Sequence, residues 1–156
     1  MRDKLKGVDK FKIADTEYDN NLAEDLYVNS TMLAEAFSDH AEKFAWYATA
    51  HELASDFEIK VKTALDRLHA TLYNQFKAEA VATGAKITEK GIESRILTDM
   101  NYMQLQDQHL DSKRQLGLLK AARDAMIHRK DMLVSAGSTY RAELQADVTL
   151  KASHLK

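Results

Sequence analysis

Apolar residues recur every three or four positions over much of the chain, and they form two stripes. The first stripe runs from Leu33 to Ala48 and the second from Phe57 to Phe76, with neither Gly nor Pro in residues 30–83. A spacing of three to four is the period of an amphipathic α-helix. The pattern therefore predicts a long helical segment over residues 30–83.

The tetrapeptide Ser55-Asp56-Phe57-Glu58 lies between the two stripes and matches a capping box, in which Ser or Thr is followed three residues later by Glu. It is the expected position of a break, although an uninterrupted helix satisfies the periodicity nearly as well. An unbroken helix would be roughly 80 Å long at 1.5 Å per residue. Since this exceeds the diameter of a compact domain, we expect either a bend near Ser55 or an elongated assembly.

Helix terminators follow this first segment. Gly84 predicts its C-terminal cap, because glycine adopts the left-handed conformation at helix ends without steric cost. Thr88 is placed to cap a connector helix over residues 88–98. Ile87 and Ile92 have the spacing of a hydrophobic staple around that cap.

A second long helix is predicted over residues 100–136, where Gly137 stops it. We expect residues 138–156 to form a short C-terminal helix and tail, and residues 1–29 to form a charged arm. The predicted fold class is all-α, with two long antiparallel helices in an elongated hairpin over residues 30–137. Within the arm, three apolar residues are spaced for a short helical turn: Leu22, Leu26 and Val28.

Composition narrows the possible chemistry. The chain has 156 residues, no proline and only five glycines, so a sandwich or barrel with turns about every 8–12 residues is very hard to build. It has no cysteine, which excludes disulfides, thiol catalysis and thiolate metal centres. No apolar run approaches the roughly 18 residues of a membrane span, and the N-terminus lacks the pattern of a signal peptide. We therefore expect an intracellular protein of the cytoplasm.

Histidines and carboxylates are the remaining candidates for catalysis or metal binding. Asp66 and His69 stand three residues apart, as in half of a metal site within a helical bundle. A di-iron bundle needs a second such motif, and a surface hydrogen bond explains this pair better. Four further histidines have no acidic residue three positions before them: His40, His51, His109 and His128. We expect no enzymatic activity, no metal and no cofactor.

A seven-residue repeat marks the second long helix. Leu119, Met126 and Leu133 form one row, while the adjoining row begins with Leu116 and then turns basic. Charges beside a coiled-coil seam specify its register and partner, or their alkyl stems cover apolar neighbours. The sequence predicts an oligomer interface formed by Leu116, Leu119, Met126, Leu133, Trp46 and Tyr47.

Basic residues interleaved with aromatic residues form the second signal. Residues 113–130 carry six basic residues and one acidic residue, a local charge of +5, and Tyr73 and Lys77 follow a basic stretch of the first helix. Basic grooves with aromatic platforms bind single-stranded nucleic acid, although amphipathic helices also carry Lys and Arg on their solvated faces. The candidate nucleic-acid contacts are Lys60, Lys62, Arg67, Lys113, Arg114, Lys120, Arg123, Arg129 and Lys130.

Residues 25–137 resemble phage recombination mediators of the UvsY type in the order of their elements. The matching pieces are Asp25-Leu26-Tyr27-Val28-Asn29-Ser30, Trp46-Tyr47, the basic stretch from Lys60 to Leu72, the connector from Lys86 to Glu93 and the closing stretch from Ala122 to Leu133. The resemblance implies a ring-like homo-oligomer that binds single-stranded DNA. It also implies loading of a RecA-like recombinase onto strands covered by single-stranded-DNA-binding protein. The family's basic residues would fall on Lys60, Lys62 and Arg67, and a phage-encoded protein would act in the host cytoplasm.

Two hypotheses remain, with a metal-dependent bundle enzyme a distant third. The first is a non-enzymatic mediator that binds single-stranded DNA. The second is a structural scaffold or coiled-coil adaptor whose basic rows contact neighbouring subunits. The net charge of −2 argues mildly against DNA binding, but an oligomer would repeat a local basic patch and concentrate its charge.

Overall fold

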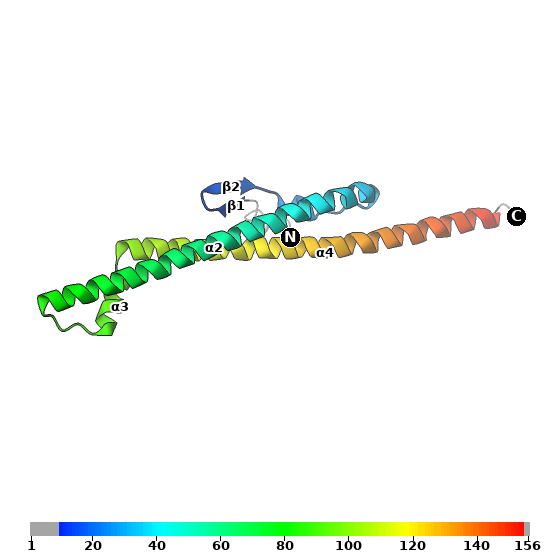
Figure 1. Ribbon diagram of the computed structural model, residues 1–156. Coiled ribbons are helices and arrows are strands. Elements are labelled where there is room, and N and C mark those ends of the chain that lie inside the picture. The colour runs from blue at the N-terminus through cyan, green and yellow to red at the C-terminus, as the bar shows by residue number, and fades with distance from the viewer. Residues whose placement is uncertain (1–9, 155–156) are drawn as a thin grey trace. The chain divides into compact units, whose positions relative to one another are not determined.

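The computed structural model describes residues 10–154, most of which are helical (Figure 1). The elements in chain order are β1 (Lys10–Ile13), β2 (Thr16–Asp19), α1 (Leu22–Leu26), the 3₁₀ helix η2 (Ser30–Met32), α2 (Leu33–Thr83), α3 (Glu89–Leu97) and α4 (Met100–His154). The two long helices pack together and α3 connects them, so the predicted all-α class is confirmed. Among the described residues, no helix is long and apolar enough to span a bilayer.

Helix α2 ends as the sequence predicts. Gly84 has φ of +66°, the left-handed conformation. Its N–H donates to the Val81 carbonyl at 3.2 Å, and the N–H of Ala85 donates to the Ala80 carbonyl at 3.0 Å. These two bonds form a Schellman motif, which satisfies the last carbonyls of the helix.

Helix α2 does not break at the predicted capping box. Ser55 lies within the helix, and Glu58 contacts His109 of α4 at 2.8 Å instead of capping a helix. Ala54 and Val61, on either side of this point, are both buried. The apolar stripe thus continues through Ser55, and its packing keeps the backbone helical where local sequence alone permits a cap.

The connector helix forms where it is predicted. The Thr88 hydroxyl accepts a hydrogen bond from the Gly91 N–H at 3.2 Å and caps α3. Ile92 is buried, and Ile87 packs against its cluster as the staple requires. These two local interactions set where α3 begins.

Gly137 does not end the second long helix, and the separate helix expected over residues 138–156 is instead the last part of α4. Gly137 is buried, and a Cβ built there would lie 3.4 Å from the Phe37 ring. A glycine within a helix costs only about 1 kcal/mol relative to alanine, and no proline follows it. Gly137 thus lies against Phe37 within a continuous helix and does not terminate it.

The predicted N-terminal arm is structured over its described part, while residues 1–9 lie outside the described residues. β1 and β2 pair as a two-stranded sheet. Phe11 and Ile13 are buried and Lys12 is exposed, the alternation of a strand with one covered face. Four-residue strands are too short to give a clear period, so the sequence does not predict the hairpin. The expected helical turn is found as α1.

The described chain divides into two compact units. Unit 1 contains residues 10–11, 18–51 and 119–154, and unit 2 contains residues 12–17 and 52–118. The core of unit 1 includes the fully buried side chains of Phe11, Tyr47, Leu119, Met126 and Leu133. The core of unit 2 contains Leu72, Phe76, Ile92 and Ile96, with Leu68, Tyr73, Ile87 and Tyr102 partly buried around it.

Candidate nucleic-acid interface

The three candidate basic residues on α2 are exposed but do not share one face. Lys60 forms an ion pair with Asp56 one turn earlier, at 2.6 Å, and both side chains are largely exposed. No ion pair engages Lys62 or Arg67 among the described residues. At about 100° per residue, Lys60 and Arg67 lie on one face and Lys62 lies well around the helix from both.

Lys113 and Arg114 are the candidates on α4 within unit 2, and both are exposed. Arg114 lines a pocket of about 400 Å³ with Lys12 and the carboxylates of Asp15 and Asp111. This pocket is therefore electrostatically mixed. In the described part of unit 2, neither Lys113 nor Arg114 forms an ion pair.

The basic candidates of unit 1 differ in their exposure and in whether they are already paired with a carboxylate. Lys120 is exposed and has no ion pair among the described residues. Lys130 is paired with Asp131 at 3.5 Å, an exposed pair of small energetic weight. Arg123 is partly buried and donates to Asp124 at 3.2 Å and to His51 Nδ1 at 3.3 Å.

Arg129 does not fit its predicted role as a phosphate contact. Its side chain is only 3% exposed. It donates to the Ala36 carbonyl and to His40 Nδ1, both at 3.2 Å, while its Nε has no hydrogen-bond partner. Burial lowers the pKa of His40 below its usual value, and the charges of Arg129 and Lys130 lower it further.

The predicted oligomer interface on α4 lies largely inside the chain. Leu119, Met126 and Leu133 are fully buried in unit 1, and Leu116 is half-buried in unit 2. The side chains of the first three therefore supply the packing of α4 within the chain and are not free to contact another subunit.

A second row of α4 is buried beside Leu119, and it is shifted by one position from the adjoining row of Leu116, Arg123 and Lys130 noted in the sequence. Ala122 and Arg129 turn inward, whereas Arg123 and Lys130 lie at the flank. Both pairs flank the Leu119 row on the helix surface, so spacing alone could not decide between them. The small side chain of Ala122 is the signal that could have indicated the side of close approach.

Trp46 and Tyr47 belong to an aromatic cluster within unit 1. Their rings pack edge to face, with the ring centroids 4.8 Å apart. Phe11 of β1 packs edge to face on Tyr47 at 6.2 Å, and Tyr18 of β2 packs on Trp46 at 6.1 Å. These contacts account for both residues within the chain, so a role in subunit contact stays a prediction.

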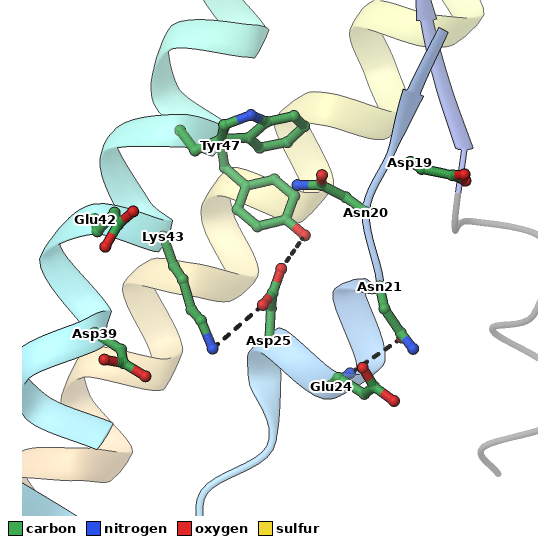
Figure 2. Close-up of a pocket in the computed structure, with 10 residues that line it drawn as sticks. Asp19, Asn20, Asn21, Glu24, Asp25, Asp39, Glu42, Lys43 and Tyr47 are labelled. Atoms are coloured by element: carbon green, nitrogen blue, oxygen red, sulfur yellow. Dashed lines mark hydrogen bonds and ion pairs between the residues drawn. The ribbon is translucent and has the colours of Figure 1, made fainter. Parts of the chain in front are cut away.

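A pocket of about 490 Å³ opens beside this cluster (Figure 2). At its centre, Asp25 accepts a hydrogen bond from the Tyr47 hydroxyl at 2.9 Å and pairs with Lys43 at 3.3 Å. Asn21, which also lines the pocket, caps α1 by accepting the Glu24 N–H at 3.2 Å. Further carboxylates line the pocket: Asp19, Glu24, Asp39 and Glu42. The site is acidic and would repel a phosphate backbone.

The structure brings no metal-binding group together in its described part, where no three His, Cys, Asp or Glu side chains are placed to hold an ion. His69 Nε2 contacts Glu93 Oε2 of α3 at 3.0 Å. The imidazole thus forms its hydrogen bond with Glu93 on the surface of unit 2, and not with Asp66, the partner expected from the sequence.

Comparison with known proteins identifies no relative. No protein-family model matches the chain, and neither a curated protein nor a solved structure gives a match.

Proposed function

We propose that this protein binds single-stranded DNA and acts, without enzymatic activity, as a recombination mediator that loads a RecA-like recombinase onto strands covered by single-stranded-DNA-binding protein. One observation carries the DNA-binding part. Five exposed basic side chains have no ion pair among the described residues: Lys62, Arg67, Lys113, Arg114 and Lys120. Side chains of this kind exchange counterions for phosphates at little internal cost.

The five cations are spread over two helices, so each contact contributes little alone. In a homo-oligomer the same contacts would repeat along one bound strand, and linked weak contacts give avidity well above the affinity of a single subunit. The mediator role and the recombinase partner rest on the resemblance of residues 25–137 to the UvsY-type family. DNA binding is the first step to test.

Fluorescence anisotropy of a labelled oligo-dT strand, measured at several salt concentrations, tests this step. We expect binding that weakens steeply with salt, with a log–log slope of about −0.7 for each phosphate contact. The variant K62Q/R67Q/K113Q/R114Q should show a shallower slope. Arg141→Gln, which removes an exposed arginine outside the candidate set, is the matched control. An unchanged slope in the fourfold variant would exclude these residues as the DNA contacts.

A second candidate function, a structural helical scaffold, is favoured by the last part of α4. Three apolar side chains at spacings of four are exposed there: Tyr140, Leu144 and Val148. Tyr140 continues the row of Leu119, Met126 and Leu133 beyond the part of α4 that is buried. Light scattering coupled to gel filtration would reveal an oligomer. An oligomer that dissociates in Leu144→Gln and binds no DNA would favour the scaffold.

A further inference from the structure

A pocket of about 280 Å³ lies in unit 2, where α2 ends and the chain turns into α3. Its apolar lining includes Ala80, Val81, Ile87 and Ile92. Ile92 is buried in the core of unit 2, and Val81 is 77% exposed. The pocket thus has a buried apolar floor at Ile92 and an exposed apolar rim at Val81. A flat apolar group of a ligand could cover both.

Tyr73 forms an aromatic wall of this pocket. Its ring packs against the core cluster of unit 2, and its hydroxyl donates to Glu89 Oε1 of α3 at 3.3 Å. These two contacts hold the ring in place without filling the pocket. A ring fixed at the edge of a pocket is a ready surface for stacking.

Two lysines line the same pocket. The Lys77 ammonium lies 5.8 Å from the centre of the Tyr73 ring, a cation–π contact. Lys86 is exposed and forms no ion pair within the described part of the chain. Of the charged groups that line the pocket, only Glu89 is acidic, and it already accepts the tyrosine hydroxyl.

We propose that this pocket binds one unstacked base of single-stranded DNA, with the base against Tyr73 and the apolar floor and its phosphate held by Lys77 and Lys86. The proposal rests on the proposed function and adds a base-binding site to the exposed phosphate contacts. An aromatic wall, an apolar floor and cations at the rim match the two parts of a nucleotide. Stacking of one base on an aromatic side chain strengthens binding by about five- to 150-fold.

The test compares a labelled oligo-dT strand with an abasic strand of equal length and charge, using the full chain and fluorescence anisotropy. Wild-type protein should bind oligo-dT at least about five-fold more tightly than the abasic strand. Tyr73→Leu should abolish this preference, while Tyr73→Phe should retain it because it removes only the hydroxyl. Tyr27→Leu, at an exposed tyrosine of unit 1 that lies outside the exposed apolar surface of α4, is the control and should leave the preference unchanged.

A second variant tests the pocket independently, in case Tyr73→Leu does not fold. K77Q/K86Q changes two exposed side chains, and it should weaken binding of both strands while circular dichroism stays unchanged. Equal binding of the two strands by wild-type protein would overturn the base pocket and leave the proposed function standing. A preference for oligo-dT that survives Tyr73→Leu in folded protein would have the same consequence. Salt-insensitive or absent binding of both strands would overturn the proposed function, and the pocket with it.

Discussion

Arg129 shows how one buried cation constrains its neighbours. A guanidinium only donates hydrogen bonds, so the His40 Nδ1 that faces it at 3.2 Å must be an unprotonated acceptor. His40 also stacks on Phe44 within α2. The neutral form of His40 is therefore the form that fits unit 1.

The stability of the protein should fall when His40 is forced to ionise. Its pKa is lowered from 6.5 by burial and by the charges of Arg129 and Lys130. The unfolded chain then binds more protons than the folded chain below about pH 6.5, so stability decreases as pH falls from there to the lowered pKa. Urea unfolding between pH 7.5 and 5 measures this effect. His40→Gln should reduce the pH dependence, and an identical profile would contradict the assignment.

Arg129 itself should contribute packing rather than DNA affinity. Arg129→Met keeps the length of the side chain and removes a buried charge whose Nε is unpartnered. We expect this change to alter the free energy of unfolding by less than about 1 kcal/mol or to stabilise the fold. Arg129→Ala should destabilise it by about 2 kcal/mol or more, since it leaves a cavity. Denaturant titration measures both, and a loss of salt-dependent DNA binding in a folded Arg129→Met variant would contradict the buried role.

At the scale of elements, different interactions determine where a long helix ends and whether it continues past a local stop signal. The end of α2 depends on the left-handed conformation of Gly84, a local property. The continuity of α2 through Ser55 depends on packing, since Ala54 and Val61 on either side of it are buried. The capping signal at Ser55 is worth about 1 kcal/mol, and the burial of the apolar stripe around it outweighs that amount. Residues 138–148 of α4 are all exposed, so α4 continues past Gly137 through local helix propensity.

Two glycine substitutions should therefore have opposite effects. Gly84→Ala places a residue with a Cβ at a backbone φ of +66°, so it should destabilise the protein by about 1 kcal/mol. Gly117 lies on the exposed face of α4, and a Cβ there meets nothing within 4 Å. Gly117→Ala should stabilise by about 1 kcal/mol through helix propensity. Thermal and urea unfolding would measure both changes, and effects of equal sign would contradict this account.

At the scale of the whole molecule, some apolar side chains of α4 are buried within the chain and others are exposed. Leu133 is fully buried, whereas Leu144, eleven residues later on the same helix, is 48% exposed. The first belongs to the core of unit 1. The second is available to a partner.

Leu133→Ala should destabilise the fold by about 2–5 kcal/mol, because it removes buried methyl groups and leaves a cavity. Leu144→Ala should change the free energy of unfolding by less than about 0.5 kcal/mol in a monomer. Urea unfolding at two protein concentrations separates these effects. If Leu144 lies in a subunit interface, its substitution becomes costly and the cost depends on protein concentration.

The sequence by itself determines that the chain is helical, the caps at Gly84 and Thr88 and the connector α3, because periodicity and capping act within a few residues. It also indicates which side chains are basic, but not which of them remain free. Only the tertiary structure decides that Arg129 is buried while Lys120 is exposed, since this depends on which side of α4 meets α2. The structure also joins Tyr73, Lys77 and Lys86 around one pocket, because the turn into α3 folds back on the end of α2. Contacts between residues distant in sequence form only through packing, which a one-dimensional period does not specify.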